Sequence, residues 1–522
     1  MQLTRLVERL AAHPGCTVVE YLGAESRSRT FPELQDDVAA AVARLRTAGV
    51  SPGMRVGILA GNCYQWIVHE LAVIELRGVV VALADAVMSS GIEAVAEKLR
   101  LHLIVTDRDS PGRPSWLVPM HEVNAIASVR AGIEYTADSE YRMPALVFSS
   151  GSFGRHKTIM TSRGGVEQLV GNLPRAFELQ DGDRFLVFLP MDSFQQRFLI
   201  YGCLWNGVNL VISEPRFLFE ALKRHPPTIL LAPPAFFEAI AGRVRNLPRR
   251  TEMLLKVLHA CRERIPLRSL RTALARLTSR RLRDALGGQV RLMITGMAPS
   301  RRNTLELFDR IGLPVYEVYG MTECGMIAWN TPQARRLGSV GKPLADAKVT
   351  IAADGEVLVT RAVQPTLGYL GEDTSEDQLQ TYRGGGTIGT GDIGRFDADG
   401  FLYLQGRKKN IIVTAGGVKL HPEAIEQRLN ASDDIGQSVV FGTGGALTAV
   451  VVATSDTPEV RGRIRGFIEA VNRDLHSEAS IVRIAFSEPL TSENGMLTAN
   501  LKLNRKAIEA RFESADVAED AA

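Results

Sequence analysis

A segment rich in glycine and serine, SSGSFGRHK at residues 149–157, follows the apolar run ALVF at 145–148 and ends in a lysine. Backbone N–H groups of such a loop surround a phosphate well, because glycine allows close approach and small hydroxyl groups add donors. The segment therefore predicts a phosphate site, although Phe153 in its middle supplies neither property. The candidate phosphate-binding residues are Ser149, Ser150, Gly151, Ser152, Gly154 and Lys157.

The same segment differs by one residue from the P-loop pattern G-x-x-x-x-G-K-[ST], because His156 replaces the second glycine between Gly151 and Thr158. A P-loop needs that glycine for a backbone conformation that a β-carbon resists. The sequence that follows also has no acidic strand end to bind magnesium. We therefore set the P-loop interpretation aside.

Three further segments carry glycines and charged residues in a fixed order: VYGMTECG at 318–325, TGDIGRFDADGFLYLQGRKKNIIVTAGGVKLHPEAIE at 390–426, and NGMLTANLKLNR at 494–505. Together with SSGSFGRHK they resemble the adenylate-forming superfamily of acyl-CoA synthetases, aryl and fatty acyl ligases, luciferases and peptide-synthetase adenylation domains. The resemblance covers nearly the whole chain, since residues 30–62 are similar to the family's opening and TGMAPS at 295–300 to its adenine-side loop.

The resemblance implies an α/β fold. Its large N-terminal domain would contain layered mixed sheets and helices plus a β-rich subdomain, and a small mobile α+β lid domain would follow at the C-terminus. It also implies the chemistry of an acyl-CoA synthetase. A carboxylate attacks the α-phosphorus of ATP and releases pyrophosphate, and the thiol of CoA then attacks the mixed anhydride. Because an anion attacks a polyanion, the first step needs Mg²⁺ and a lysine as electrostatic help.

The nucleotide-contacting residues follow from the matched motifs. Thr322 and Glu323 match the pair that the family uses on phosphate and magnesium, so Glu323 is the implied metal ligand. Asp392 matches the acid that accepts hydrogen bonds from both ribose hydroxyls, and Arg407 matches the ribose-contacting arginine. The other residues implied to lie beside the adenine are Gly296, Met297, Ala298, Tyr319, Gly320 and Met321.

The C-terminal segments imply a mobile catalytic lid. Lys502 matches the lysine that reaches the cleft during adenylation, and Lys409 stands where the family has its hinge. Rotation about the hinge would exchange Lys502 for a loop without large side chains, which leaves a slot for the pantetheine arm of CoA. That loop comprises Ala415, Gly416 and Gly417.

The chain departs from the family pattern at the pyrophosphate and acyl sides of the site. The phosphate loop usually reads T-S-G-S/T-T/S-G-x-P-K-G, and here Phe153, His156 and Thr158 replace a hydroxyl residue, the proline and the last glycine. The usual histidine and glycine of the acyl pocket are also absent from LPMDSFQQRF at 189–198. The candidate pocket residues in their place are Ser193, Phe194 and Gln195. The pattern predicts a protein that binds an acyl adenylate but handles ATP poorly.

The function that we infer is acyl-CoA synthetase chemistry on a bulky hydrophobic carboxylic acid, of the kind met in secondary metabolism. If adenylation is weak or lost, the chain would take a preformed acyl adenylate from a separate adenylating enzyme. One alternative is an acyl-AMP ligase that loads a carrier protein, against which the Gly416–Gly417 slot and the lack of a carrier domain argue. A second alternative is a non-catalytic protein that binds an acyl adenylate, against which Lys502 argues.

Alternating elements must position these residues. Strand-like runs at 55–61, 102–107 and 184–190 alternate with helical patterns, which predicts largely parallel sheets covered by helices. Short strands separated by turns then predict an antiparallel subdomain at about 335–405. We expect an N-terminal domain at 1–407 and a lid domain at 408–522, with the boundary at Arg407 to Asn410.

Composition excludes several other classes of protein. The 522 residues carry a net charge of +3 without a long basic run, so we expect neither a nucleic-acid partner nor a membrane-surface patch. Five scattered cysteines without a C-x-x-C pair argue against a disulfide framework and a zinc site. The N-terminal residues do not form a secretory signal, and the longest apolar stretch, 198–212, is too short and too polar to span a bilayer. We therefore expect a cytoplasmic protein.

Overall fold

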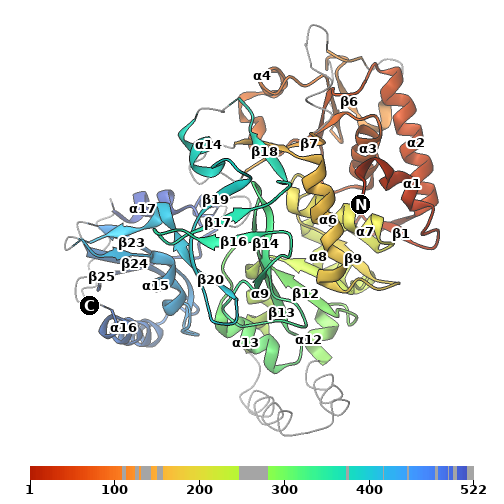
Figure 1. Cartoon of the computed structure of the whole chain (residues 1–522). Coiled ribbons are helices and arrows are strands. Elements are labelled where there is room, and N and C mark those ends of the chain that lie inside the picture. The colour runs from red at the N-terminus through yellow and green to blue at the C-terminus, as the bar shows by residue number, and fades with distance from the viewer. Residues whose placement is uncertain are drawn as a thin grey trace.

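The computed structural model of the chain describes residues 1–108, 113–123, 128–130, 143–149, 157–245, 280–371, 375–414, 417–443, 446–475, 480–491, 493–497 and 503–513 (Figure 1). Within these ranges two large sheets form the N-terminal part, a smaller sheet follows, and a separate group of helices and strands forms the C-terminal part.

The first large sheet has, among the described residues, the strand order β18-β8-β7-β4-β3-β5-β6. Its central strands pair in parallel and are fully buried, and they consist almost entirely of aliphatic residues, as expected for a sheet covered on both faces. β8 is antiparallel to both β7 and β18. The strands are β3 (Arg55–Leu59), β4 (Val79–Ala82), β5 (Leu103–Thr106), β6 (Leu117–Pro119), β7 (Ala145–Phe148), β8 (Thr158–Thr161) and β18 (Thr366–Tyr369).

The second large sheet has the described strand order β15-β14-β13-β12-β11-β9-β10-β1-β2. The strands from β13 to β1 run parallel, and the antiparallel pairs lie at the two edges. The strands are β1 (Thr17–Tyr21), β2 (Ser26–Thr30), β9 (Arg184–Val187), β10 (Asn209–Ser213), β11 (Ile229–Ala232), β12 (Leu292–Thr295), β13 (Val315–Met321), β14 (Gly325–Trp329) and β15 (Lys342–Pro343).

Helices fill the space between the two large sheets and cover their outer faces. One core contains side chains of β3 and β7 from the first sheet, β9 and β12 from the second, and α3, α6 and α7 between them. α4 packs on the outer face of the first sheet, and α8, α9 and α13 pack on that of the second. These helices are α3 (Tyr64–Glu75), α4 (Ile92–Lys98), α6 (Arg163–Phe177), α7 (Phe194–Trp205), α8 (Leu218–Arg224), α9 (Pro234–Arg245) and α13 (Arg302–Arg310).

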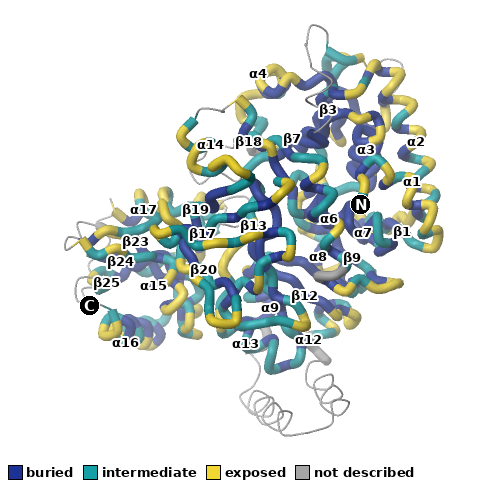
Figure 2. Tube along the Cα trace, in the orientation of Figure 1, coloured by how far each residue is buried: buried dark blue, intermediate teal, exposed yellow. Residues whose placement is uncertain are grey.

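The pattern of burial follows from this layering (Figure 2). α3 buries residues on every side, because it lies inside the core, whereas α2 (Phe31–Thr47) buries one face only. Thr30 and Glu33 begin α2 with a capping box, in which each side chain binds the backbone N–H of the other. The remaining described N-terminal helices are η1 (Leu3–Arg5), α1 (Leu6–Leu10), η2 (Asp85–Ser90), η3 (Met120–Glu122), η4 (Pro215–Phe217) and α12 (Arg280–Ala285).

A smaller antiparallel sheet with the order β16-β17-β19-β20 leads to the C-terminal part. α14 (Glu376–Thr381) lies between β18 and β19 in the chain. The strands are β16 (Lys348–Ile351), β17 (Glu356–Thr360), β19 (Thr387–Phe396) and β20 (Leu402–Arg407), and η5 (Lys408–Asn410) follows β20 at once.

The C-terminal part has its own cores on both faces of the sheet β23-β24-β25. α15 and α16 cover one face and α17 the other, and the partly buried pair of Arg505 and Glu426 joins α17 to α15 with N···O distances of 2.8 and 2.6 Å. The elements are β21 (Ile412–Val413), β22 (Lys419–Leu420), α15 (Pro422–Leu429), β23 (Ile435–Thr443), β24 (Ala446–Ala453), α16 (Pro458–Arg473), β25 (Ile481–Phe486) and α17 (Arg505–Glu513).

Arg301, at the start of α13, connects the C-terminal part to the second large sheet. Its guanidinium donates to the carbonyl of Ile435 at 2.8 Å, to the side chain of Asn430 at 3.2 Å and to the carbonyl of Gly436. Asn303 donates to Asp433 at 3.2 Å. These contacts and the passage of β20 beside α15 place the C-terminal part next to the carboxyl ends of β12 and β13 (Figure 1).

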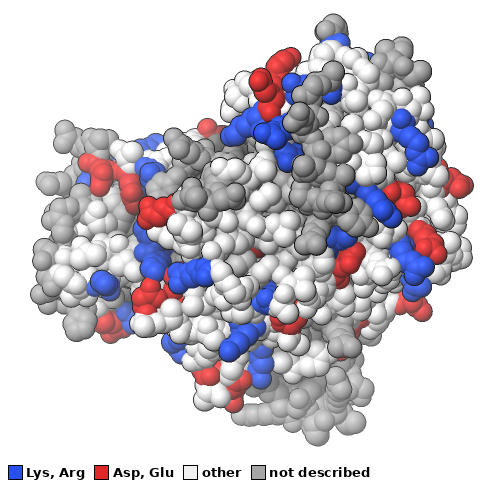
Figure 3. Space-filling model, turned by 45° about the horizontal axis from the view of Figure 1, so that its top comes forward, with Lys and Arg blue, Asp and Glu red and all other residues white. Residues whose placement is uncertain are grey.

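Charged side chains of both signs are interspersed on the face of the molecule shown in Figure 3. Among the described residues, no helix combines the length and the apolar character that a membrane span requires.

A buried ion pair lies inside the layer of helices. The guanidinium of Arg197 on α7 contacts Oε1 of Glu70 on α3 at 2.5–2.6 Å, and both side chains are at most 2% exposed. Tyr201 donates to the same oxygen, and the indole of Trp66 donates to Oε2 at 3.1 Å. Burial lowers the pKa of Arg197, but the carboxylate of Glu70 outweighs this effect and raises the pKa overall, so the guanidinium stays charged.

We expect Arg197→Ala to lower the free energy of unfolding by about 3–5 kcal/mol, because the carboxylate of Glu70 would remain buried without its charge partner. The double variant Glu70→Gln, Arg197→Met should lose clearly less, since it buries no lone charge. Chemical denaturation followed by tryptophan fluorescence measures both. A double variant as unstable as Arg197→Ala would contradict this explanation.

Candidate functional site

The candidate site is built around the carboxylate of Asp392 on β19. Asp392 lies opposite Arg407 in the β19–β20 register, and Nε of Arg407 contacts its Oδ1 at 2.8 Å. The hydroxyl of Tyr319, on β13 of the second large sheet, donates to Oδ2 at 2.6 Å. The structure thus brings together three residues that the sequence assigned to the ribose and adenine.

The electrostatics of this cluster keep Tyr319 protonated and Arg407 charged. Burial and the nearby carboxylate of Asp392 raise the pKa of Tyr319, so its hydroxyl remains a donor. Asp392 likewise raises the pKa of Arg407, which stays charged. A carboxylate oxygen can accept more than one hydrogen bond, so an anion held in this way is suited to binding two neighbouring hydroxyl groups.

The tight turn between β13 and β14 holds the second candidate pair. Glycine is required at position 320, near the end of β13, because a Cβ there would lie 2.5 Å from the carbonyl oxygen of Gly325. Glu323 is 8% exposed, and its Oε1 accepts a hydrogen bond from the hydroxyl of Tyr369 at 3.0 Å. Met321 ends β13, and Oγ1 of Thr322 accepts from Nε2 of Gln195 at 3.5 Å.

The predicted phosphate loop lies between β7 and β8. The backbone N–H of Ser149 donates to the carbonyl of Lys157 at 3.0 Å, so the two ends of the predicted loop are adjacent. Nζ of Lys157 contacts Asp377 at 2.6 Å and lies 4.6 Å above the centre of the Tyr369 ring. The other predicted loop residues lie outside the described part of the chain, namely Ser150, Gly151, Ser152, Phe153 and Gly154.

The predicted adenine-side loop follows β12. Gly296 is buried against Val318, and Met297 is 38% exposed and has φ of +73°, a conformation that is uncommon for a residue with a side chain. Ala298 is exposed beside it. Strain of this kind is found preferentially at ligand sites, which agrees with the assignment of this loop to a ligand.

Two of the three predicted pocket residues lie at the site. Oγ of Ser193 donates to Oε1 of Gln195 at 3.0 Å, and Gln195 reaches Thr322. Phe194 instead points into the core, where it is 4% exposed and contacts Phe198 edge to face.

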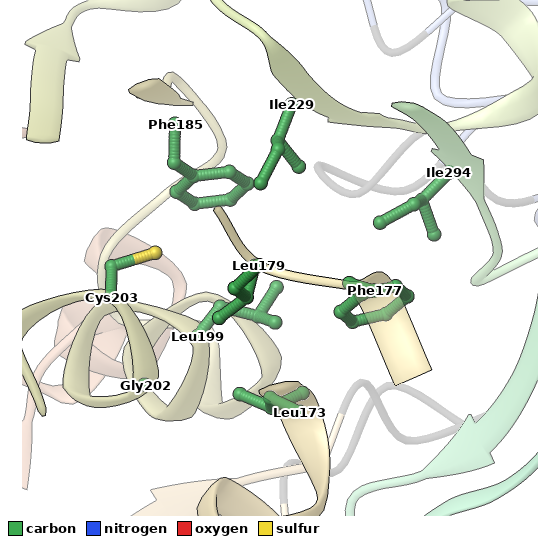
Figure 4. A pocket seen from close by; sticks show the side chains of 9 residues that line it. All are labelled: Leu173, Phe177, Leu179, Phe185, Leu199, Gly202, Cys203, Ile229 and Ile294. Carbon is green, nitrogen blue, oxygen red and sulfur yellow. The ribbon is translucent and has the colours of Figure 1, made fainter. Parts of the chain in front are cut away.

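An apolar cavity lies further along α7 (Figure 4). Leu199, Gly202 and Cys203 follow Gln195 at spacings of four, seven and eight residues, so they share its face of the helix. The cavity has a volume of about 20 Å³, which is room for little more than one water molecule. The other side chains that line it come from α6, the strands of the second large sheet and the α6–β9 connection, namely Leu173, Phe177, Leu179, Phe185, Ile229 and Ile294.

The hinge candidate Lys409 lies in η5, and its Nζ contacts Oδ1 of Asp377 at 3.1 Å. Gly417 is described and has φ of +79°, which only glycine adopts without strain. Ala415, Gly416 and Lys502 lie outside the described residues. Leu497 and Leu503, which are described on either side of Lys502, form a β-bridge.

The oxygen atoms of Glu323 and Thr322 suit a magnesium ion that arrives with a nucleotide. The described residues contain no group of three or more His, Cys, Asp or Glu side chains placed to hold a metal by themselves. Mg²⁺ characteristically binds one or two carboxylates plus phosphate oxygens and waters, so Glu323 and Thr322 fit this mode.

Sequence reasoning missed Tyr369, Asp377 and the cavity residues. Only the cavity had a signal, since Leu199, Gly202 and Cys203 continue the helical face that starts at Gln195. Tyr369 and Asp377 carry no motif, and they reach the site through the fold of β18 and α14 alone.

Comparison with known proteins gives a consistent result. A model of the AMP-binding enzyme family matches residues 6–370, and a model of the AMP-binding enzyme C-terminal domain matches residues 409–516. The long-chain-fatty-acid–CoA ligase FadD15 of Mycobacterium bovis is 28% identical over 551 aligned residues, which cover 93% of this chain and 91% of that protein. The 2-succinylbenzoate–CoA ligase of Bacillus cereus is 24% identical, with 84% of each chain covered.

Solved structures with low sequence identity share the fold. The o-succinylbenzoate CoA synthetase from Bacillus subtilis, in complex with its acyl-adenylate intermediate, has a TM-score of 0.74 at 19% identity and covers 99% of both chains. ATP-bound MatB from Rhodopseudomonas palustris has a TM-score of 0.75 at 21% identity, with 98% of this chain and 99% of that chain covered. The predicted α/β architecture, a large N-terminal domain of mixed sheets followed by a smaller C-terminal domain, is confirmed.

We expect AMP to raise the thermal stability of the protein more than pyrophosphate does, because the Tyr319–Asp392–Arg407 cluster is fully assembled. At one hundred times its dissociation constant, AMP would add about 2.7 kcal/mol. Asp392→Ala should abolish the AMP shift in differential scanning fluorimetry. The matched control is Asp399→Ala in the same hairpin, which removes only a surface pair with Arg336. Equal shifts with both ligands would contradict the assignment.

Glu317 on β13 makes the free energy of unfolding depend on pH. Burial raises its pKa from 4.5 to about 7, so it folds in the neutral form and its ionisation favours the unfolded chain. Stability from this group is complete below pH 4.5 and is lost as the pH rises to about 7. We expect Glu317→Gln to remove this loss, which is at most about 3.4 kcal/mol at 1.36 kcal/mol per pKa unit. Denaturation at pH 5 and pH 8 tests it, and an unchanged pH dependence would overturn it.

Proposed function

The chain belongs to the AMP-binding enzyme family, whose model matches residues 6–370, and we propose from this that it makes an acyl-CoA thioester from a bulky hydrophobic carboxylic acid. At the coarser level it is an acyl-CoA ligase-type enzyme, an acid–thiol ligase. The observation that carries the finer proposal is the Tyr319–Asp392–Arg407 cluster beside the Thr322–Glu323 turn, in which Tyr319 and Asp392 are buried and Arg407 is exposed. This arrangement offers a nucleoside site and a phosphate site at one strand end.

The reaction has two half-steps. In the first, a carboxylate oxygen bonds to the α-phosphorus of ATP and the bond from that phosphorus to the bridging oxygen breaks, so pyrophosphate leaves. In the second, the sulfur of CoA bonds to the acyl carbon and the carbon–oxygen bond breaks, so AMP leaves and the thiol proton is lost to solvent. Both half-steps pass through the same acyl adenylate, which the enzyme must hold throughout.

The nucleoside end of that intermediate fits the Asp392 cluster. The carboxylate of Asp392 would accept hydrogen bonds from both ribose hydroxyls while Arg407 and Tyr319 hold it in place. The loops that flank Tyr319 would enclose the adenine, with Gly320 and Met321 on one side and Gly296, Met297 and Ala298 on the other. The o-succinylbenzoate CoA synthetase of Bacillus subtilis has been solved with an acyl adenylate bound, which supports a ligand of this class.

The phosphate end fits Thr322, Glu323 and Lys157. Glu323 would contribute one carboxylate to Mg²⁺, and the metal, when bound, neutralises charge on the phosphates as the carboxylate of the substrate approaches. The same Bacillus subtilis protein has also been solved with ATP and a magnesium ion. The hydroxyl of Tyr369 fixes the orientation of Glu323.

The acyl group would lie along α7. Gln195 and Ser193 lie beside Thr322, and Leu199, Phe177 and Ile294 line the apolar cavity further along α7. This cavity has a volume of about 20 Å³, so a bulky acid would enter only if the side chains that line it moved apart. Apolar lining favours a hydrophobic acid, because each methylene group removed from water contributes about 0.8 kcal/mol. Relatives that are named for long-chain fatty acids and for 2-succinylbenzoate agree with a hydrophobic or aromatic substrate class.

The lid would complete each half-step in turn. Lys502 would approach the α-phosphate and the carboxylate during adenylation. Rotation about Lys409 would then bring the loop with Gly416 and Gly417 to the cleft, where the missing side chains leave room for the pantetheine arm of CoA.

We further propose that adenylation is the weaker half-reaction. Phe153 replaces a hydroxyl residue of the phosphate loop, and such a hydroxyl can donate a hydrogen bond to the β- or γ-phosphate. A charge-assisted hydrogen bond of this kind contributes on the order of 1.5–3 kcal/mol. At about 1.4 kcal/mol per decade, its loss would slow adenylation by one to two decades. A preformed acyl adenylate from a separate adenylating enzyme would bypass this step.

Two assays test the proposal. We expect slow ATP–pyrophosphate exchange with a library of hydrophobic carboxylic acids, and fast thioester formation from a synthetic acyl adenylate plus CoA. Phe153→Thr should raise the exchange rate tenfold to a hundredfold, whereas the control Phe219→Thr, at a residue 41% exposed on α8, should not. Lys502→Ala should lower the ATP-dependent rate far more than the adenylate-dependent rate.

Each other outcome has a definite meaning. Fast exchange by the unchanged protein would overturn weak adenylation and leave a complete acyl-CoA synthetase. Transfer of the acyl group to a carrier protein but not to CoA would show that the carrier protein is the acceptor and that the chain is an acyl-AMP ligase. Binding of the acyl adenylate without any thioester would show a non-catalytic binding protein.

A further inference from the structure

A single carboxylate, that of Asp377, contacts lysines from two functional segments. Its Oδ2 lies 2.6 Å from Nζ of Lys157, at the end of the phosphate loop, and its Oδ1 lies 3.1 Å from Nζ of Lys409, in the hinge candidate η5. The exposed fractions of the three side chains are 42% for Asp377, 22% for Lys157 and 54% for Lys409. Lys157 and then Lys409 hold the pKa of Asp377 below its ordinary value, so it remains an anion.

Hydrogen bonds fix the position of Asp377 relative to the rest of the site. Ser375 caps the start of α14 by accepting from the backbone N–H of Gln378. Oε1 of Gln378 accepts from the backbone N–H of Tyr369 at 2.9 Å, and the Tyr369 hydroxyl donates to Glu323. α14 is therefore tied to β18 and to the proposed metal ligand, while Lys157 packs over the Tyr369 ring.

The hinge has a second anchor that does not involve the phosphate loop. Lys408, next to Lys409, contacts Asp354 at 2.5 Å and Glu356 at 2.9 Å. Two adjacent lysines thus tie η5 to the N-terminal part through different acids. Of these two anchors, the one at Asp377 is shared with Lys157.

We propose that Asp377 is a positioning residue that couples anion binding at Lys157 to the firmness of the hinge at Lys409. The proposal rests on the proposed function, in which Lys157 meets the phosphates of ATP. Two lysines that share one carboxylate repel each other, so each weakens the attraction of the other to Asp377. When pyrophosphate or the phosphates of ATP draw Lys157 away, Asp377 would hold Lys409 more firmly.

The coupling gives the two half-steps an order. With phosphates bound, the hinge would be held in one arrangement while adenylation takes place. Once pyrophosphate leaves, Lys157 would return to Asp377 and loosen Lys409, which favours the rotation that thioester formation requires. If pyrophosphate shifts the equilibrium between two hinge arrangements by some factor, linkage requires that the favoured arrangement bind pyrophosphate more tightly by the same factor.

Hydrogen–deuterium exchange of the full-length chain, read on the peptide that spans residues 405–413, tests the coupling. Lys157→Gln should slow exchange and Asp377→Asn should speed it, each by up to about fivefold, as exposed ion pairs allow. Lys157→Gln should have no effect on exchange in the Asp377→Asn background. In the Asp377→Glu background, which keeps the carboxylate, Lys157→Gln should again slow exchange. Pyrophosphate should act on the unchanged protein as Lys157→Gln does, and have no effect on Asp377→Asn.

Asp354→Asn is the matched control, because it removes the same charge from the neighbouring anchor without any contact to Lys157. It should speed hinge exchange, yet Lys157→Gln should still slow exchange in that background. The coupling is overturned if Lys157→Gln has no effect, or has the same effect with and without Asp377. Failure of the proposed function would appear separately, as the absence of thioester formation from an acyl adenylate, and would leave these exchange results unaltered.

Discussion

The carboxylate of Asp392 is the constraint on which the site depends. A buried charge is costly unless it is paired and hydrogen-bonded, and here the partners come from two different sheets. Tyr319 belongs to the second large sheet, whereas Arg407 ends the small antiparallel sheet. Satisfying one anion therefore fixes the two sheets relative to each other. It also fixes the point where the chain leaves β20 for the hinge candidate and the C-terminal part.

The two ends of the site differ in how they are held. At the proposed nucleoside end, short contacts from Tyr319 and Arg407 hold both oxygens of the buried carboxylate of Asp392, and the side chain of Arg407 is 52% exposed. At the phosphate end, Lys157 and Asp377 are partly exposed, and their pairing depends on which other charges are nearby. A firmly held nucleoside site combined with an adjustable phosphate site, as proposed, would suit a protein that keeps an acyl adenylate while pyrophosphate leaves.

The core beneath the site is specialised for rigidity. The Glu70–Arg197 pair joins α3 to α7 inside the layer between the two large sheets, so the helix that carries Gln195 cannot shift without breaking a buried charge pair. The apolar cavity opens one turn further along the same helix, between α7, α6 and β12. At about 20 Å³ this cavity is too small for a bulky acyl group, so the proposed substrate would require the side chains that line it to move apart.

The sequence by itself determined the local elements and the chemical identity of the motifs. Runs such as VVVA at β4 and LIVT at β5 form buried strands because their residues suit a covered sheet, and the matched motifs selected Asp392, Arg407, Tyr319 and Glu323. Only the tertiary structure decided which distant side chains meet. Gln195 reaches Thr322 across 127 positions, and Asp377 joins Lys157 to Lys409. Such contacts follow from strand order and layer packing, which arise from the burial of the whole core. The residues that make them therefore carry no periodicity or spacing in the sequence that would predict the contact.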